Sequence, residues 1–232
     1  MDKRASARDG LLEREREVIR ILSLLLDENP DFIVVGGYAV STYKKRFSID
    51  LDLVVSEVDL NRFESILKKQ GYINHYEKKV ELLYGENFKR FMKKLLSLPV
   101  DVDLLINGLV SRTTNASWGF DYIKKNSIKN KLNDLEFLIP KKELLIAMKF
   151  HSGRLSDIRD IVALMPCNEE ELKKHLLIGD LKNLKESIKK QLAFLEKPQF
   201  DDSFKGIFGV HVYNKDDVEK AKEITRKILK EM

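Results

Sequence analysis

The chain has 232 residues with 42 basic and 37 acidic side chains, and its net charge of +5 permits contact with a polyanion without requiring it. This length suits one large domain or two small ones, and the apolar runs are far too short to cross a bilayer. The single cysteine, Cys167, excludes an internal disulfide and a cysteine-rich zinc site.

The first predicted element is an amphipathic helix over residues 11–28, with apolar side chains at helical spacing. Asn29-Pro30-Asp31 ends it, because proline cannot continue a helix. The residues before this helix lack the apolar core of a signal peptide. We therefore expect a cytoplasmic protein that does not enter a membrane.

A strand over Phe32–Val35 then runs directly into Gly36 and Gly37, and a helix of about two turns is predicted over 38–45. Glycines after a buried strand let the backbone turn sharply and let a ligand approach the main-chain N–H groups. The segment lacks both GxxxxGK[ST] and GxGxxG, so neither a Walker loop nor a dinucleotide fold is indicated.

The next strand, which ends at Val55, carries Asp50 and Asp52 with one leucine between them. Alternate side chains of a strand share a face, so both carboxylates point the same way and the apolar residues point the other way. Adjacent carboxylates repel each other and lose hydration on burial, and a hard divalent cation with oxygen ligands relieves both costs. The alternative is a solvent-facing edge strand with two inert acids.

After this strand we expect a helix over 58–70, with Asp59 as a possible cap and Gly71 as its end. Residues 72–97 are ambiguous. Residues 72–76 could form a strand, whereas 88–96 show helical spacing.

A second acidic strand follows at Pro99–Ile106, with Asp101 and Asp103 on one face and apolar residues on the other. Two neighbouring strands that share one acidic pocket explain this repetition better than two unrelated edge strands. The order of helices and strands also suits one mixed sheet.

In the rest of the chain, the predicted secondary structure changes from strands and loops to helices near Ile139. Residues 107–134 are polar and rich in loops, with Trp118 and Phe120 expected in the core, and a short strand over Leu135–Ile139 follows. Helical periodicity then replaces strand patterns; we expect helices over 142–151, 156–164, 169–177, 181–195 and 216–232, and a loop over 198–211. The predicted fold is α/β (α+β), with a mixed-sheet domain over 1–139 and a helical domain over 140–232.

Two stretches carry a resemblance to a known family. The first is GGYAVSTYKKRFSIDLDLVV, and the second, at 139–164, is IPKKELLIAMKFHSGRLSDIRDIVAL. Together with the second acidic strand they resemble the DNA polymerase β-like nucleotidyltransferase superfamily, and within it the AbiEii toxin type. The resemblance covers about residues 30–165.

The resemblance implies a set of nucleotide-binding residues at and after the glycine turn. Gly36 and Gly37 match the loop that holds the phosphates, and Arg46 and Ser48 lie a short helix later. Most superfamily members have Gly-Ser at the turn, so one hydroxyl donor is missing here. Ser41 or Ser48 could replace it.

The resemblance also implies a catalytic set. Asp50 and Asp52 match the metal ligands, Asp103 matches the third carboxylate, and Asp101 on the same face is the fallback. Lys149 matches a lysine that contacts phosphate, and Asp160 matches the acid on the next helix, with Arg154 and Asp157 beside them. These residues have inert alternatives: Lys149 could be a solvated lysine, the helix charges could pair with one another, His151 could be a surface or packing residue, and the lysines at 182, 185, 189 and 190 could form a solvated face.

The resemblance implies transfer of a nucleoside monophosphate from an NTP to a hydroxyl acceptor, with two Mg²⁺ ions to align and neutralise the phosphates. The acceptor could be RNA, tRNA in particular, or a protein hydroxyl, and a toxin role with an antitoxin partner would follow. Two alternatives remain open: a small-molecule acceptor, as in antibiotic-modifying relatives, and a non-catalytic module that binds nucleotide or a partner. The modest charge argues against a plain nucleic-acid binder.

Overall fold

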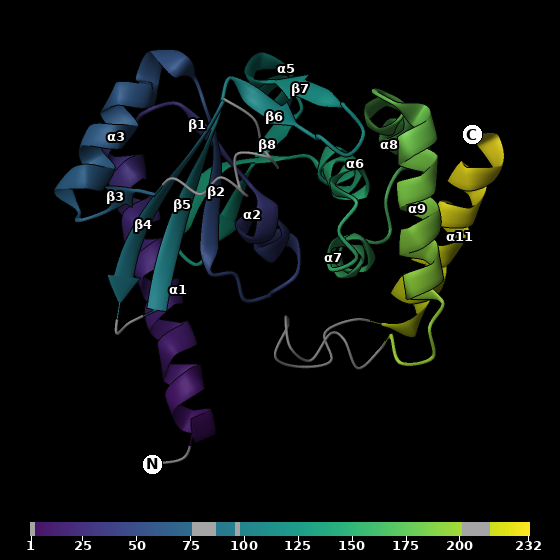
Figure 1. Ribbon diagram of the computed structural model, residues 1–232, viewed down its shortest axis with the longest axis horizontal. Helices are drawn as coiled ribbons and strands as arrows, with labels where there is room; N and C mark the ends of the chain where they lie inside the picture. The colour runs from purple at the N-terminus through teal and green to yellow at the C-terminus, as the bar shows by residue number, and fades with distance from the viewer. Residues whose placement is uncertain (1–2, 76–86, 96–97, 201–213) are drawn as a thin grey trace.

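A five-stranded mixed sheet lies between two groups of helices in the computed structural model, which describes residues 3–75, 87–95, 98–200 and 214–232 (Figure 1). The strand order is β1-β2-β5-β4-β3. The strands are β1 (Phe32–Val35), β2 (Asp50–Val55), β3 (Ile73–Asn74), β4 (Phe88–Leu95) and β5 (Leu98–Ile106).

The two acidic strands are neighbours, as the sequence predicts. β2 and β5 run parallel, with Asp50 opposite Asp101 and Asp52 opposite Asp103. All other adjacent pairs in this sheet are antiparallel. Residues directly opposite one another on adjacent strands share a face, so the four aspartates lie on the same side of the sheet.

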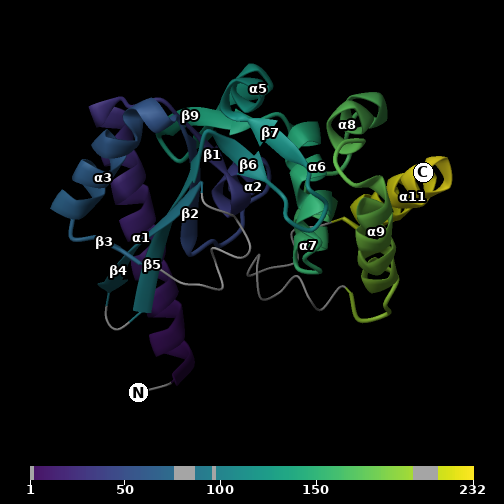
Figure 2. The same cartoon turned by 45° about the horizontal axis from the view of Figure 1, so that its top comes forward.

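The opposite face of the sheet is closed by α1 (Lys3–Glu28) and α3 (Leu60–Lys69), as Figures 1 and 2 show from two directions. A set of fully buried apolar side chains forms this layer, namely Val18, Ile21, Leu22 and Leu25 of α1 and Phe63 and Leu67 of α3. Leu51 and Leu53, which alternate with the aspartates of β2, belong to the same buried core cluster. The apolar alternation of β2 thus decides which face the acids occupy.

The ends of these helices follow the sequence signals except at one cap. α1 ends before Asn29, which adopts a left-handed φ of 54°, and Gly71 with a φ of 81° follows α3. The prediction that Asp59 caps the helix is wrong, because its side chain makes no capping hydrogen bond. Instead, Ser56 Oγ accepts from the N–H of Val58 at the start of η1 (Glu57–Asp59).

The helical spacing over 88–96 is misleading, because residues 88–95 form strand β4 in the middle of the sheet. Phe88, Phe91 and Met92 repeat at the helical interval, yet pairing with β5 aligns Phe91 with buried Val102. Tertiary pairing therefore overrides the local pattern. The possible strand over 72–76 is reduced to Ile73–Asn74, and residue 76 lies outside the described part of the chain.

Residues 107–134 contain more regular structure than their polarity suggests: β6 (Gly108–Val110), β7 (Ser117–Gly119), α5 (Phe120–Lys125) and β8 (Ser127–Leu132), with β9 (Leu135–Pro140) following. β6 pairs with β7, and β8 pairs with β9, which also contacts β1. Trp118 is 2% exposed and Phe120 is partly buried against the same core, as expected.

Beyond Pro140 the described residues contain helices and no strands, namely α6 (Lys142–Ser152), α7 (Asp157–Ala163), α8 (Glu169–Leu176), α9 (Leu181–Leu195) and α11 (Lys215–Glu231). α6 and α7 contact α2 (Gly36–Tyr43), which follows the glycine turn, and α8, α9 and α11 lie further from the sheet. The division into two domains at 139/140 remains a prediction. Most of the expected loop over 198–211 lies outside the described residues. None of the helices described is both long and apolar enough to cross a membrane.

Candidate functional site

The first component of the site is the row of four aspartates on the shared face of β2 and β5. Asp50 and Asp101 form one opposed pair, and Asp52 and Asp103 form the next. Asp103 is only 1% exposed, whereas the other three are partly buried. The parallel register therefore concentrates negative charge where little water can screen it.

Asp52 is the least neutralised of the four. Burial, and then the charges of Asp50 and Asp103, raise its pKa well above the ordinary value, although Lys149 and Arg154 act in the opposite direction. Among the described residues, none hydrogen-bonds to or forms an ion pair with the carboxylate of Asp52 or Asp50. A cation between these two side chains would remove that unfavourable electrostatic energy.

Asp103, by contrast, already has a counter-ion. Arg90 lies directly opposite it on β4, and its Nε and Nη2 donate to the two carboxylate oxygens at 2.8 and 2.7 Å. Burial still raises the pKa of Asp103 to about 6 against this stabilisation by Arg90. The sequence did not single out Arg90, because residues 88–93 show no regular alternation of apolar and polar side chains that would mark a strand.

The acids fit the chemistry of a divalent metal site. Asp101 Oδ1 is buried without a hydrogen-bond partner, and the carboxylates of Asp50 and Asp52 lie on the same face. These are hard oxygen donors, which Mg²⁺ prefers. In the described part of the chain, no three acidic, imidazole or thiol groups are arranged to hold a metal together. Both oxygens of Asp103 already accept hydrogen bonds from Arg90.

The glycine turn lies directly against this acidic face. Gly36 has a φ of +62° and begins α2, and a Cβ there would lie 1.8 Å from Asp52 Oδ2. The position requires glycine for both its backbone conformation and its contact with the carboxylate. The first N–H groups of α2 have no partner within the helix, so they can bind an anion.

Ser48 lies beside the second glycine. A Cβ on Gly37 would be 2.3 Å from Ser48 Oγ, so the Ser48 hydroxyl fills the space next to residue 37. Ser41 is committed elsewhere, because its buried hydroxyl hydrogen-bonds to the carbonyls of Gly37 and Arg46. Of the two serines considered as replacements for the missing hydroxyl, Ser48 has the more suitable location.

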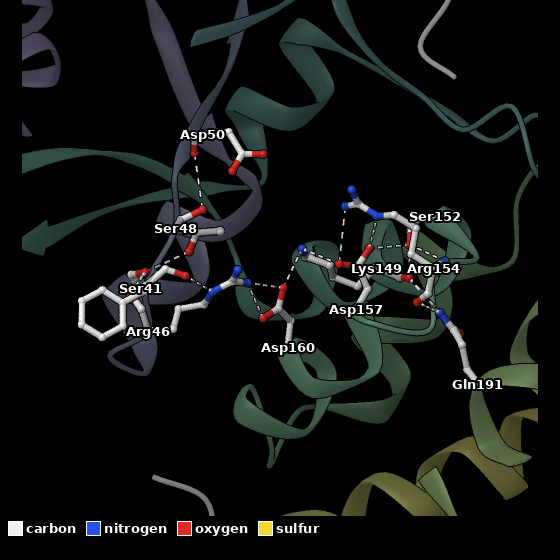
Figure 3. Close-up of polar contacts among 12 residues, drawn as sticks. Ser41, Arg46, Ser48, Asp50, Lys149, Ser152, Arg154, Asp157, Asp160 and Gln191 are labelled. Atoms are coloured by element: carbon white, nitrogen blue, oxygen red, sulfur yellow. Dashed lines mark hydrogen bonds and ion pairs between the residues drawn. The ribbon is translucent and has the colours of Figure 1, made fainter. Parts of the chain in front are cut away.

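A second group of charges connects α6 and α7 (Figure 3). Lys149 is 6% exposed, and its Nζ lies 3.1 Å from Asp157 and 2.7 Å from Asp160. The pKa of Lys149 is raised, because these two carboxylates outweigh the cost of its burial. Lys149 is thus a buried ion-paired residue, and the alternative of a solvated lysine is wrong.

Arg46 and Arg154 extend this group at its two ends. Arg46 Nη1 donates to both oxygens of Asp160 at 2.5 and 2.6 Å, which joins the glycine-turn segment to α7. Arg154 Nε donates to Asp157 Oδ2 at 2.9 Å, while its side chain remains 57% exposed. Figure 3 shows the chain of contacts from Ser41 and Arg46 through Asp160, Lys149 and Asp157 to Arg154.

A cavity of about 150 Å³ separates the acidic face from α6. Asp52 and Gly36 line one side, and Lys149 and Arg154 line the other. The remaining lining is largely apolar and includes Val35, Leu105, Leu109, Val110, Leu145 and Met148, with Arg112 and Thr113 at the β6–β7 connection. The sequence did not indicate the contribution of residues 109–113, since it depends on how that hairpin folds over β5.

Gly36, Asp52 and Lys149 of the two predicted sets thus line the cavity. Asp160 pairs with Lys149 and Arg46 beside it. His151 is not part of the cavity; it is fully buried, where Thr114 Oγ1 and the carbonyl of Leu176 contact its ring nitrogens at 2.6 and 2.8 Å. Lys182, Lys189 and Lys190 are exposed along α9, as expected for a solvated face.

No family model matches the chain, and no curated protein matches it. Among solved structures, an H. pylori protein assigned as a nucleotidyltransferase has a TM-score of 0.52 at 18% identity, with 96% of each chain covered. An antigenic nucleotidyltransferase-like protein from Paracoccidioides brasiliensis has a TM-score of 0.49 at 16% identity, covering 83% of this chain and 92% of that one. The lincosamide antibiotic adenylyltransferase LnuA has a TM-score of 0.48 at 18% identity, covering 65% and 95%.

The chain therefore has the mixed α/β fold found in nucleotidyltransferases, as predicted. The narrower resemblance to the AbiEii type remains a prediction. A shared fold at this identity does not define a reaction, so the function depends on the site itself.

Proposed function

We propose that this protein is a metal-dependent nucleotidyltransferase that moves a nucleoside monophosphate from an NTP to a hydroxyl acceptor and releases pyrophosphate. The observation that supports this most is the placement of Asp50 and Asp52. Both lie without a cationic partner among the described residues, and Asp52 contacts the glycine that begins α2. A cation held there would lie directly beside a helix start that can bind an anion, as a metal-bound triphosphate requires.

Asp50 and Asp52 would hold Mg²⁺, with a carboxylate of β5, Asp101 or Asp103, as the third acidic ligand. When bound, Mg²⁺ neutralises phosphate charge and lowers the pKa of the acceptor hydroxyl. A third acid at the same face can also accept the hydroxyl proton. The partly buried setting strengthens each of these electrostatic interactions.

The phosphates would contact the opposite side of the site. The N–H groups at the start of α2 and the hydroxyl of Ser48 would provide donors, and Arg154 lines the cavity with a largely exposed side chain. Lys149 and Asp160, with Arg46, would act mainly by fixing α6 and α7 against the glycine turn, because their charges already pair with one another. The positive charge of Lys149 still favours the ionised form of Asp52.

The acceptor is a hydroxyl of RNA, tRNA in particular, or of a protein, in keeping with the AbiEii resemblance and with a toxin that an antitoxin partner neutralises. An antibiotic-type small molecule is the second candidate, which the largely apolar cavity lining favours. Both candidates need the same transfer chemistry, so the acceptor can be identified with one assay.

The test incubates the protein with Mg²⁺ and each α-labelled NTP in the presence of total RNA, cell protein or a panel of hydroxylated small molecules. Label should move to one acceptor class, and Asp50→Asn should abolish the transfer. Asp134→Asn, which changes an exposed acid in the β8–β9 turn, is the matched control and should retain it.

Binding of Mg²⁺ and NTP without transfer to any acceptor would favour the non-catalytic alternative. Failure of the protein to bind NTP in the presence of Mg²⁺ would contradict the proposed function itself.

A further inference from the structure

We infer that the cavity between Asp52 and α6 binds one apolar six-membered ring whose hydroxyl group faces Asp52, so that the acceptor of the proposed function is a phenol or another ring alcohol. The inference rests on the proposed function for the transfer itself, and it narrows the acceptor to one chemical class. That class includes the side chain of tyrosine as well as free small molecules.

The walls of the cavity are mainly aliphatic. Six of the lining residues are apolar, namely Val35 of β1, Leu105 of β5, Leu109 and Val110 of β6, and Leu145 and Met148 of α6. The four from β1, β5 and α6 are at most 6% exposed. Phosphate or ribose groups would lose hydration against such walls without gaining hydrogen bonds, so the walls favour an apolar group.

The size of the cavity matches one ring. Its volume is about 150 Å³. An apolar cavity of about 150 Å³, engineered in another protein, stays dry and binds benzene. A purine or a whole nucleoside is larger and would extend beyond such a space, whereas a single ring fills it and gains the dispersion contacts that an empty cavity lacks. The exposed side chains of Val110 and Arg154 mark where the cavity meets solvent, so that a ring can enter.

The hydroxyl groups in the lining already donate to other protein groups. Ser111 Oγ donates to the carbonyl of His151 at 2.6 Å, and Thr113 Oγ1 donates to the carbonyl of Ser152 at 3.3 Å. Ser152 Oγ donates to Asp157 Oδ2 at 2.6 Å. Each of these hydroxyls has a single proton to donate, so the walls offer few donors to a nucleobase, whose ring carries several acceptors.

Asp52 differs from these hydroxyl groups. It lines the same cavity, and none of the described residues donates a hydrogen bond to its carboxylate. An ionised carboxylate only accepts hydrogen bonds, and an O–H group complements it. An apolar ring with one hydroxyl therefore fits both the aliphatic walls and this acid.

This placement also suits the reaction of the proposed function. The hydroxyl oxygen forms a bond to the α-phosphorus of the NTP while the bond from that phosphorus to pyrophosphate breaks, and pyrophosphate leaves with the bonding electrons. The hydroxyl proton passes to an acid of the same face. Because Gly36 contacts Asp52, a hydroxyl beside Asp52 lies next to the helix start at which the phosphates would bind.

The first experiment measures ligand binding to the full-length protein, without NTP or metal, from the methyl signals in its NMR spectrum. Phenol should shift the methyl signals of Leu109, Leu145 and Met148. Benzene should shift the same signals with at least about tenfold weaker affinity, because it cannot hydrogen-bond to a charged group. Cytidine, whose ring is polar, should leave these signals unchanged at the same concentration. Tighter binding of cytidine than of phenol at these methyl groups would overturn the inference.

Two variants separate the contribution of the ring from that of the hydroxyl. Leu109→Phe fills part of the cavity and should weaken phenol binding at least about tenfold. Leu138→Phe is the matched control, because Leu138 is also a partly buried leucine but lies outside the cavity, and it should bind phenol as the unmodified protein does. Asp52→Leu should remove the preference for phenol over benzene and retain benzene binding.

Circular dichroism must show that Leu109→Phe is folded; if it is not, the comparison of phenol with benzene in the unmodified protein and in Asp52→Leu decides the matter. Equal affinities of the unmodified protein for phenol and benzene, or unchanged phenol binding by a folded Leu109→Phe, would contradict the inference.

The transfer assay then identifies the source of the hydroxyl. Label recovered on tyrosine in cell protein indicates a protein acceptor, and label on a small ring alcohol indicates a free one; either result supports the inference. Label on RNA alone would overturn the inference and support the proposed function. Failure to bind NTP would remove the acceptor role even where phenol binds, so the two failures are distinguishable.

Discussion

Two groups of buried charges lie on opposite sides of the same cavity, and they differ in how they are neutralised. On β2, burial and then the charges of Asp50 and Asp103 raise the pKa of Asp52. On α7, Asp157 accepts hydrogen bonds from Lys149, Ser152 and Arg154. Burial alone would raise the pKa of Asp157, but Lys149 and Arg154 hold it down to about 2.

This difference shows that burial of a charge does not by itself mark a functional residue. In the α6–α7 group, each acid already has a cationic partner within the protein. On the acidic face, Arg90 pairs with Asp103 and more distantly with Asp101, whereas Asp50 and Asp52 have no such partner among the described residues, so a bound cation would recover electrostatic energy there. A structural role is therefore expected for the first group and a binding role for the second.

The largest expected effect comes from exchanging one aspartate in each group for asparagine. Asp52→Asn should lower kcat/KM for nucleotidyl transfer by about 10³-fold, the scale of losing one electrostatic stabiliser of a transition state. Its free energy of unfolding should stay the same or rise, because an unfavourable buried charge is removed. Rates of label transfer and urea denaturation measure the two quantities.

Asp157→Asn should instead lower the free energy of unfolding, because Lys149 loses one of its two carboxylate partners, and it should lower kcat/KM less than Asp52→Asn does. The comparison between the groups breaks down if Asp52→Asn destabilises the protein more than Asp157→Asn does.

Lys149→Met is the next largest change. It leaves Asp157 and the pair of Asp160 with Arg46 without their central cation, and breaking such a buried pair costs about 3–5 kcal/mol of unfolding free energy. Lys189→Met on the exposed face of α9 is the control and should alter stability by less than about 0.5 kcal/mol. Equal urea midpoints for the two variants would show that Lys149 does not hold the helices together.

The two groups should also respond to pH with opposite signs. The pKa of Asp157 is lowered to about 2, so its contribution is present above pH 4 and is lost as pH falls towards 2, amounting to about 2 kcal/mol. The pKa of Asp103 is raised to about 6, so the folded state binds the proton more tightly, and stability falls as pH rises from about 4 through 6.

Urea denaturation at a series of pH values checks these signs. Asp157→Asn should flatten the acidic limb alone, and Asp103→Asn should reduce the slope between pH 4 and 6 without abolishing it, because the raised pKa values of Asp52 and Asp101 also contribute to the slope. An unchanged slope between pH 4 and 6 in Asp103→Asn would assign that titration to other groups.

The smallest expected effects are losses of unfolding free energy when alanine replaces either of two glycines with positive φ, Gly71 and Gly36. Gly71→Ala should cost about 1 kcal/mol from backbone conformation alone, because its Cβ would meet nothing nearer than 3.9 Å. Gly36→Ala should cost about 1 kcal/mol more, since its Cβ would clash with Asp52 Oδ2. Gly36→Ala should also weaken Mn²⁺ binding while Gly71→Ala leaves it unchanged; equal Mn²⁺ affinities would show that the contact with Asp52 is not important.

Much of the acidic face could be predicted from the sequence. The spacing of Asp50 and Asp52, and of Asp101 and Asp103, specifies one face of each strand, because the side-chain period of a strand is two. The position of Gly36 directly after a buried strand indicates a sharp turn, which the structure has. Both inferences depend on residues close together in the chain.

The ion-pair partners of Arg90 and Lys149 could not be predicted in this way. Arg90 faces Asp103 only because β4 inserts next to β5, and the local spacing around it favoured a helix. Lys149 is neutralised only because α7 folds back against α6 and brings Asp157 and Asp160 to its Nζ.

The sequence by itself therefore determined where the chain turns, which residues share a face and which acids lie together. The tertiary structure decided which of those charges have a partner. The physical reason is range: periodicity follows from local backbone geometry, whereas the energy of a buried charge depends on groups a few ångströms away that come from distant parts of the chain.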